Sequence, residues 1–219
     1  MNNEGFYNSR EDAGRILADK IAELNLENPY LLAIPRGGIQ VAECVSDKLK
    51  IPINPIVVKK IPIPGNPEAG FGAITEDGIK IMDDKAVSYM GISHEAIDKI
   101  SEGIIKEVIH RANVYGRPDR EKVRLSDVII IDDGVATGYS LIAAITSVKG
   151  MKPVSITAAV PVASKFAYDK IVHMVDNFVC PLVDDTYFFA VASYYKEWFD
   201  LSEDQIKSII GTSREKYKF

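Results

Sequence analysis

The sequence predicts an α/β fold in which a mostly parallel sheet is flanked by helices on both faces. Three features lead to this prediction: Val- and Ile-rich runs alternate with amphipathic segments, the runs are apolar throughout, and polar or glycine-rich turns follow them. Continuously apolar strands are typical of parallel sheets, because crossover helices cover both faces. The length of 219 residues suits a single domain over 1–219.

The first half of the chain should contribute two strands, two helices and a hairpin. Ser9 should cap a helix over SREDAGRILADKIAEL; the strand YLLAI follows, and then a helix, GIQVAECVSDKL, from Gly38. IVVKK, residues 56–60, is the second predicted strand. The prolines and glycines of residues 61–72 exclude a regular helix and favour a mobile loop, which leads into a hairpin formed by FGAIT and IKIM.

The second half continues the alternation of helices and strands. A long helix is predicted from Ser93 to about Tyr115, and a buried strand over Val128–Ile131. A helix should begin near Thr137, followed by the strand SITAAVPV, the helix SKFAYDKI and a last apolar strand around FVCPLV. The tail is rich in aromatic residues, namely Tyr187, Phe188, Phe189, Tyr194, Tyr195, Trp198 and Phe199.

Composition disfavours several classes of protein. Acidic residues outnumber basic ones by 31 to 26, the net charge is −5, and no run of basic residues stands out, so nucleic acid is not an expected partner. No apolar run is long enough to cross a bilayer and the first residues do not resemble a secretory leader, so we expect a cytoplasmic protein without membrane association. Cys44 and Cys180 suggest neither a disulfide framework nor a zinc site.

The stretch VIIIDDGVATGYS, residues 128–140, combines a buried strand with two carboxylates and a turn of small and hydroxylated residues. Ligands of such sheets bind at the carboxyl ends of the strands, where Asp132 and Asp133 should lie. Glycines, backbone N–H groups at a helix start and hydroxyl groups suit one phosphate. Neither a nucleotide-triphosphate P-loop nor a dinucleotide fingerprint fits the spacing. A strand-to-helix turn capped by one Asp is the alternative.

A ribose 5-phosphate satisfies both halves of this stretch, because its hydroxyls donate to carboxylates while its phosphate reaches the turn. The stretch closely resembles the phosphoribosyl pyrophosphate (PRPP) signature of type I phosphoribosyltransferases, and the fold this implies is the type I phosphoribosyltransferase fold with a small hood subdomain. By this resemblance Asp132 and Asp133 bind the ribose hydroxyls. The rest of the donor loop is Gly134, Val135, Ala136, Thr137, Gly138, Tyr139 and Ser140.

The resemblance also implies a pyrophosphate site. AIPRGG ends the first predicted strand, and Arg36, Gly37 and Gly38 are carried over from the family as pyrophosphate-binding residues, although a simple turn is the alternative. Lys59 or Lys60 should contact the pyrophosphate or its magnesium ion, and the spacing does not choose between them, because successive strand residues face opposite sides. Mg²⁺ is implied as an ion carried with PRPP, without a dedicated protein motif.

Further expectations concern closure of the site and the acceptor. The loop of about 61–72 resembles the mobile loop that closes over the site in this family. Ala136 stands where hypoxanthine-type members have an Asp, so Glu68 is the candidate general base, with a solvated loop charge as the alternative. The hood should come mainly from about 184–219, where aromatic rings could stack on a planar acceptor or could pack on the core or a second subunit.

Nearly the whole chain resembles one subgroup, the predicted phosphoribosyltransferases whose acceptor has not been assigned. FYNSREDAGRILA, PRGG, PGNPEAGFGAI, DDGVATG and the aromatic tail with LSEDQI carry this likeness. It implies a homodimeric pentosyltransferase of nucleotide metabolism that joins ribose 5-phosphate to a nitrogenous acceptor. A PRPP-binding regulatory protein without turnover and a hydrolase acting on PRPP or a nucleotide are the alternatives, because fold does not determine function.

Overall fold

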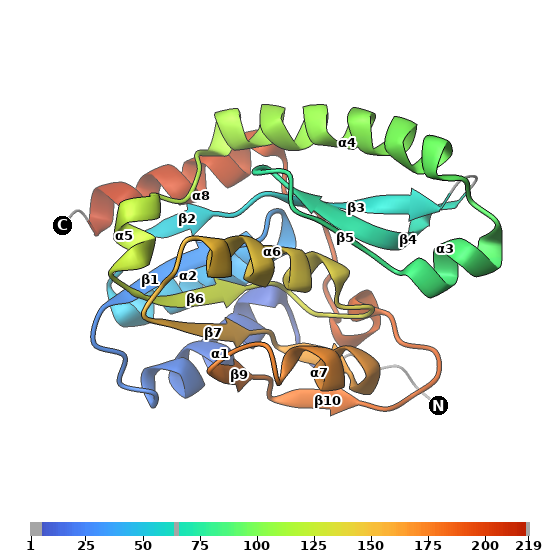
Figure 1. The fold of residues 1–219 in the computed structure, drawn as a ribbon. Helices are drawn as coiled ribbons and strands as arrows, with labels where there is room; N and C mark the ends of the chain where they lie inside the picture. Colours follow the sequence, from blue (N-terminus) through green and yellow to red (C-terminus); the bar gives the residue numbers. More distant parts are fainter. Residues whose placement is uncertain (1–5, 64–65, 218–219) are drawn as a thin grey trace.

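The computed structural model describes residues 6–63 and 66–217 and confirms the α/β prediction (Figure 1). Its centre is a five-stranded sheet in the order β2-β1-β6-β7-β9, in which every adjacent pair is parallel. Its strands are β1 (Pro29–Ala33), β2 (Ile53–Pro55), β6 (Asp127–Ile131), β7 (Ser155–Ala159) and β9 (Asn177–Val179). The carboxyl ends of these parallel strands therefore share one edge, where ligands of such sheets bind.

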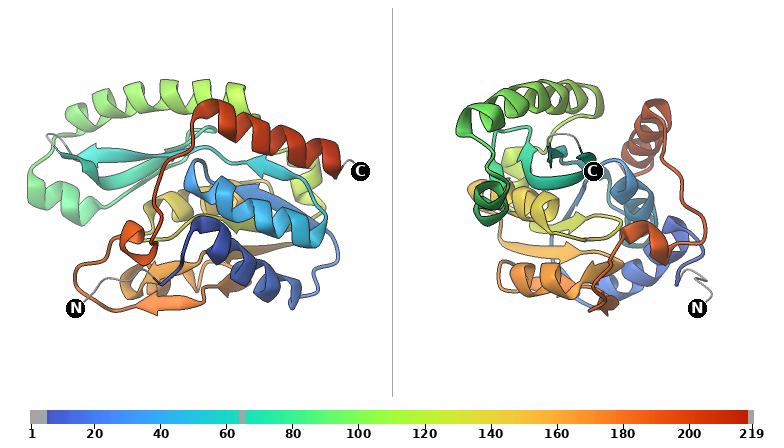
Figure 2. Two further views of the ribbon diagram at one scale, coloured as in Figure 1. Left: turned by 180° about the vertical axis from the view of Figure 1, so that it is seen from behind. Right: turned by 90° about the vertical axis from the view of Figure 1, so that its right-hand side faces the viewer.

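Helices cover both faces of this sheet. Figures 1 and 2 show α1 and α2 on one face, with α8 beside them, and α6 and α7 on the other. Their bounds are α1 (Arg10–Ala22), α2 (Gly37–Leu49), α6 (Tyr139–Gly150), α7 (Lys165–Ile171) and α8 (Glu203–Lys216). The predicted cap at Ser9 is confirmed, since its side chain accepts the backbone N–H of Asp12; Ser93 and Ser164 cap the helices that follow them in the same way.

The two faces of the sheet belong to two separate apolar clusters. Leu31 and Ile129 lie in the cluster that includes α1 and α2, whereas their neighbours Leu32 and Ile130 lie in the cluster that includes α6. All four are fully buried. Because successive strand residues point to opposite faces, a strand between two helical layers must be apolar at every position, which explains the unbroken apolar runs.

A second sheet lies above the first and is antiparallel. It contains β3 (Val58–Ile63), β4 (Asn66–Thr75) and β5 (Lys80–Met82), joined to α3 (Asp84–Met90) and covered by the long predicted helix, α4 (His94–Tyr115) (Figure 1). The prediction of one strand over 56–60 is wrong. The chain leaves the parallel sheet after Pro55, and at Val58 it begins to pair with Thr75 of β4 instead. Lys59 and Lys60 therefore stand on the second sheet.

The predicted loop of about 61–72 is largely a hairpin. Residues 61–63 and 66–72 belong to β3 and β4, with register shifts on both sides of Pro62, and residues 64 and 65 lie outside the described part of the chain. Gly72 allows β5 to approach closely, because a Cβ there would lie 2.3 Å from the carbonyl oxygen of Ile81. Motion of this hairpin stays a prediction.

Two other predicted strands are each divided by a proline. SITAAVPV breaks at Pro161 into β7 and β8 (Val162–Ser164), and the strand around FVCPLV breaks at Pro181 into β9 and β10 (Leu182–Asp184). Proline has no N–H to give to a ladder, so it ends regular pairing. The short strands β8 and β10 pair with each other in parallel. The sequence did not predict the helices α3 and α8, the short helix α5 (Arg120–Arg124) or the 3₁₀ turn η1 (Val191–Tyr194).

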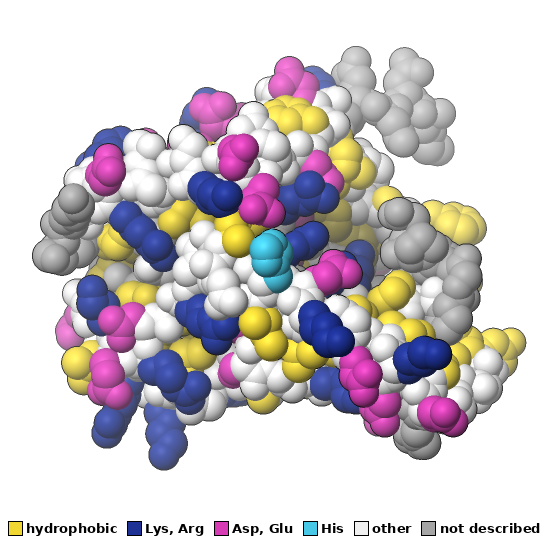
Figure 3. Space-filling view, turned by 90° about the horizontal axis from the view of Figure 1, so that it is seen from above, with side chains coloured by type: hydrophobic (Ala, Val, Ile, Leu, Met, Phe, Trp, Pro, Cys, Tyr) yellow, Lys and Arg dark blue, Asp and Glu magenta, His cyan; other side chains and the backbone are white. Residues whose placement is uncertain are grey.

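Charges are mixed on the face that α4 covers. Figure 3, which views the molecule from that side, shows Lys and Arg side chains interspersed with Asp and Glu among the described residues. A basic stripe of the kind that tracks a nucleic-acid backbone is not seen on the described part of this face. Within residues 6–63 and 66–217, every helix is too short or too polar to traverse a bilayer.

One buried carboxyl group stands outside the parallel sheet. Glu76, at the turn between β4 and β5, is 9% exposed, and its backbone N–H donates to the carbonyl oxygen of Val57 at 3.2 Å. Its Oε2 has no hydrogen-bond partner among the described residues. Burial, with a smaller contribution from the carboxylate of Asp77, raises the pKa of Glu76 to about 7.

Candidate functional site

A cavity of about 560 Å³ lies at the carboxyl edge of the parallel sheet, beneath the antiparallel sheet. It is lined by segments that follow β1 and β6, by β3 and β4, and by the tail between η1 and α8. The structure brings together nearly all the residues predicted from the sequence, namely Arg36, Gly37, Lys59, Lys60, Asp132, Asp133, Gly134, Val135, Ala136, Thr137, Gly138, Tyr139 and Ser140.

The two carboxylates after β6 occupy different electrostatic environments. Burial and the negative charge of Asp133 raise the pKa of Asp132 well above its ordinary value, while the charge of Lys60 opposes this. Burial also raises the pKa of Asp133, but the guanidinium of Arg10 opposes the shift. Asp132 Oδ1 accepts the backbone N–H of Asp133 at 2.9 Å. Among the described residues, Asp133 therefore has a cation as a direct partner, whereas Asp132 has none within hydrogen-bond distance.

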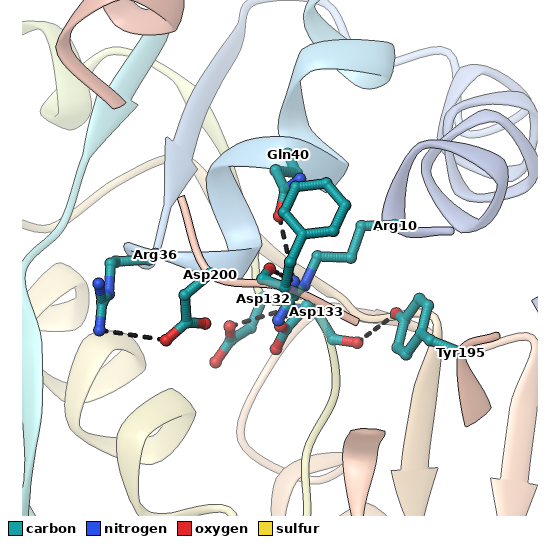
Figure 4. A network of polar contacts seen from close by, with 8 residues as sticks. Arg10, Arg36, Gln40, Asp132, Asp133, Tyr195 and Asp200 are labelled. Atoms are coloured by element: carbon teal, nitrogen blue, oxygen red, sulfur yellow. Dashed lines mark hydrogen bonds and ion pairs between the residues drawn. The ribbon is translucent and has the colours of Figure 1, made fainter. Parts of the chain in front are cut away.

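Arg10 is the cation that the sequence did not reveal. Its side chain is 3% exposed, and its Nε donates to Asp133 Oδ2 at 2.7 Å (Figure 4). Its NH1 donates to Oε1 of Gln40 at 3.2 Å and to the carbonyl oxygen of Phe199 at 2.5 Å. The guanidinium carbon lies 3.7 Å from the centre of the Trp198 ring, a cation–π distance. One side chain from α1 thus joins β6 to the tail.

The glycines after β1 allow the chain to pack against these carboxylates. A Cβ on Gly37 would lie 1.8 Å from Asp133 Oδ2, and a Cβ on Gly38 would lie 2.8 Å from the carbonyl oxygen of Ile131. Contacts this close to backbone or to a fixed carboxylate require the chain to shift. Gly37 lines the cavity, whereas Gly38 is buried behind it.

The turn after Asp133 is held by β8 and begins α6. Val135 donates its N–H to the carbonyl oxygen of Val162 at 2.9 Å, and the hydroxyl of Ser164 donates to the carbonyl oxygen of Ala136 at 2.6 Å. Gly138 caps α6 with a φ of 90°, in the left-handed region that favours glycine. Thr137 is exposed to the cavity side, so the turn presents backbone N–H groups and a hydroxyl at a helix N-terminus.

Tyr139 differs from the prediction in how its hydroxyl is used. The hydroxyl donates to Asp83 Oδ2 at 2.5 Å and accepts from Nζ of Lys170 at 3.2 Å. The hydrogen bond from Tyr139 lowers the pKa of Asp83, which also caps α3. The ring therefore lines the cavity, while its hydroxyl connects the turn to the segment that follows the antiparallel sheet.

The two lysines of β3 separate as strand alternation requires. Nζ of Lys59 forms an ion pair with Glu107 of α4, and this hydrogen bond lowers the pKa of Glu107. Lys60 is exposed, and its charge acts on Asp132. Of the two, Lys60 is therefore the one directed toward the carboxylates.

Arg36 is paired with the tail. Its NH2 lies 3.1 Å from Asp200 Oδ2 (Figure 4). Its NH1 donates to the carbonyl oxygen of Leu201 at 3.3 Å. Both side chains are about half exposed, at 42% and 57%. The Pro35–Arg36 peptide bond is cis. An exposed pair of this kind contributes little stability, so an anion can compete for Arg36.

The aromatic tail contributes to the site through two of its rings. Trp198 lines the cavity, and the hydroxyl of Tyr195 donates to the backbone carbonyl of Asp133 at 2.5 Å. Tyr187 and Phe188 are 93% and 90% exposed and do not line it, while α8 packs against α2 and β2. The side chain of Glu68, the candidate base, lies outside what the structure describes.

Comparison with protein families places this geometry in a known group. A model of the phosphoribosyl transferase domain matches residues 6–198, which include every residue of the cavity except Asp200. Two curated proteins of Mycobacterium tuberculosis, from strains CDC 1551 and H37Rv, are 32% identical over 206 residues and carry the provisional name phosphoribosyl transferase. The match covers 93% of this chain and 46% of theirs, so the chain spans about half the length of these relatives.

Solved structures share the fold over nearly the whole chain. The protein TT1426 from Thermus thermophilus is 31% identical, with a TM-score of 0.71 over 93% of this chain and 97% of that one. A hypothetical protein from Neisseria gonorrhoeae, solved with bound ppGpp, is 14% identical, with a TM-score of 0.53 over 95% of this chain and 96% of that one. The second likeness concerns the fold alone.

Proposed function

Because the chain belongs to the phosphoribosyl transferase domain family, we propose that it is a pentosyltransferase that moves ribose 5-phosphate from Mg-PRPP to a nitrogenous acceptor and releases pyrophosphate. One observation carries the proposal. Asp132 and Asp133 lie in the same cavity as the turn of residues 136–140 and the cations Arg36 and Lys60. A ligand that fits must present hydroxyls to carboxylates and phosphates at both ends, as PRPP does.

In this proposal each part of the donor has a partner. The ribose hydroxyls donate to Asp132 and Asp133, and the 5-phosphate accepts backbone N–H groups and the Thr137 hydroxyl at the start of α6. The pyrophosphate lies toward Arg36 and Lys60, and it replaces Asp200 as the partner of Arg36. Exchange of one anion for another at a half-exposed guanidinium costs little, because the Arg36–Asp200 pair is solvated.

Magnesium enters this proposal as an ion carried by the donor. Among the described residues, His, Cys, Asp and Glu side chains form no group of three that could hold a metal ion. Mg²⁺ keeps several waters and commonly binds substrate phosphates, so pyrophosphate oxygens and water would be its main ligands. When bound, it would neutralise charge on the leaving pyrophosphate.

The reaction would proceed by breaking the bond between ribose C1 and pyrophosphate, through an oxocarbenium-like state. Arg36 and Lys60 would stabilise the departing negative charge, and the β3–β4 hairpin would exclude water from the cavity. Trp198 offers an apolar surface on the tail side for a planar acceptor. Glu68 remains the proposed base, since Ala136 provides no carboxylate. The family resemblance further implies a cytoplasmic homodimer.

The decisive assay incubates the protein with Mg-PRPP and a panel of purines, pyrimidines and amines, and follows pyrophosphate release. We expect release only when one class of acceptor is present. Release without any acceptor would indicate a hydrolase, and PRPP binding without release under any condition would indicate a regulatory protein. Absence of PRPP binding would refute the proposal.

Lys60 and Lys59 provide a matched pair for locating the pyrophosphate. Lys60→Met is expected to weaken binding of Mg-pyrophosphate about tenfold, the loss of one charge-assisted contact. Lys59→Met removes the same charge from the neighbouring position, whose ammonium group is occupied by Glu107, and should change binding less than about twofold. Isothermal titration calorimetry of both variants measures this. Equal losses of Mg-pyrophosphate affinity in the two variants would contradict the proposal that Lys60, and not Lys59, contacts the pyrophosphate.

A further inference from the structure

Three residues of the tail, Tyr195, Phe199 and Asp200, form polar contacts with residues at the carboxyl edge of the parallel sheet. The hydroxyl of Tyr195 donates to the backbone carbonyl of Asp133, Arg10 donates to the carbonyl oxygen of Phe199, and Arg36 pairs with Asp200. The contact through Arg10 differs from the other two, because the same guanidinium also binds the Asp133 side chain and stacks on Trp198. Arg10 is therefore the described residue that joins a carboxylate side chain of the site to the tail.

The burial of Arg10 makes this connection stiff. A guanidinium that is 3% exposed cannot exchange its partners for water without a large free-energy cost, because a buried charge left without its partner is strongly destabilising. If the Asp133 carboxylate is displaced, the guanidinium of Arg10 must therefore move with it to keep the ion pair. Arg10 in turn cannot move without changing its bond to Phe199 and its stacking on Trp198.

We infer that Arg10 is a positioning residue that couples the Asp133 side chain to the tail segment Tyr195–Asp200. The position of Trp198, on the side proposed for the acceptor, then depends on whether the Asp133 carboxylate binds the ribose of the donor. Arg10 lines the cavity, and its guanidinium binds protein partners, namely Asp133, Gln40, Phe199 and Trp198. It fixes the orientation of the Asp133 carboxylate and the position of the Trp198 ring in the cavity wall. The inference that donor binding is transmitted to Trp198 rests on the proposed function, whereas the coupling between Asp133 and Trp198 does not.

The chain contains a single tryptophan, so intrinsic fluorescence reports Trp198 without labelling. In the ligand-free protein, Asp133→Asn should shift the Trp198 emission, because the ion pair that fixes Arg10 is weakened. Asp132→Asn is the matched control, since it makes the same chemical change one residue earlier, where Arg10 donates no hydrogen bond. It should leave the emission as in the wild type. A shift of equal size in both variants would overturn the inference.

A double-mutant cycle tests the role of Arg10 itself. Arg10→Lys keeps the charge but has a single ammonium group in place of the planar fork that binds Asp133, Gln40 and Phe199 together. In the Arg10→Lys background, Asp133→Asn should no longer shift the emission of Trp198. Additive shifts would show that the signal bypasses Arg10 and would overturn the inference. Arg10→Met provides a second background, and circular dichroism verifies that each variant is folded.

Donor titration separates this inference from the proposed function. In the wild type, Mg-PRPP should change the emission of Trp198, and in Arg10→Lys the donor should bind about tenfold more weakly with little change in emission at saturation. A wild type that binds no Mg-PRPP would refute the proposed function, but the ligand-free cycle would still decide whether Arg10 couples Asp133 to the tail. An emission change that persists in Arg10→Lys would overturn the coupling.

Discussion

Asp132→Asn should weaken PRPP binding about 100-fold, while the chain should remain at least as stable as the wild type. The carboxylate of Asp132 is an acceptor to which no described cation binds directly, and burial together with Asp133 raises its pKa. An ionised Asp132 is therefore costly in the free protein. Asn has nearly the same shape and can still accept the N–H of Asp133, but it loses the charge that strengthens the bonds to ribose hydroxyls.

The comparison with Asp133→Asn makes this prediction specific. Asp133 is paired with a buried guanidinium, so its neutralisation should weaken donor binding and also lower the free energy of unfolding. PRPP affinity by calorimetry and unfolding by urea, measured on both variants at about pH 8, separate the two effects. Undiminished PRPP binding in Asp132→Asn would refute the placement of the ribose, and a clearly destabilised Asp132→Asn would contradict the account of its charge.

Glu76→Gln should raise the free energy of unfolding at about pH 8 by about 3 kcal/mol. Glu76 is buried at the turn between β4 and β5, its Oε2 lacks a partner among the described residues, and its pKa is raised to about 7 in the folded chain, against 4.5 for an unperturbed group. Between pH 4.5 and about 7, Glu76 is therefore mostly protonated in the folded state and mostly ionised in the unfolded state. Stability from this group is therefore present at low pH and is lost as the pH rises toward 7.

The pH dependence provides the internal control. Below about pH 5 both states carry a protonated Glu76, so wild type and Glu76→Gln should have nearly equal free energies of unfolding. The two curves should separate as the pH rises and become parallel above about pH 8. Urea unfolding at several pH values measures the difference. If the plots of unfolding free energy against pH stay parallel for the two proteins, ionisation of Glu76 does not destabilise the folded state and the prediction is wrong.

The sequence was sufficient for the elements and positions that are determined locally. Ser9 precedes an amphipathic segment and caps it, and the apolar strand before Asp132 and Asp133 places both carboxylates at the sheet edge. These features depend on neighbours within a few residues, so pattern and chemistry are enough to predict them. The transition from β2 to β3 was missed because Ile56, Val57 and Val58 are apolar and β-branched, a pattern that fits a strand in either sheet.

Residues that act through distant contacts were not predictable in this way. Arg10 lies on the first turn of α1, where a positive charge opposes the helix dipole, and this unfavourable placement is the only local sign that it has a partner elsewhere. That partner is Asp133, 123 positions away. Asp200 and Tyr139 likewise find their partners, Arg36 and Asp83, only in the folded chain. Periodicity contains no information about such pairs.

The pairing of the first described residues with the tail has a consequence for assembly during synthesis. Tyr7 bridges to Tyr195 and its carbonyl oxygen accepts the N–H of Lys196 at 2.9 Å, and Arg10 reaches Phe199 across 189 positions. Contacts of such long sequence separation close the largest loops and tend to form late. A growing chain can therefore build much of the parallel sheet on the ribosome, yet the cavity at its carboxyl edge stays without the tail until residue 200 has emerged.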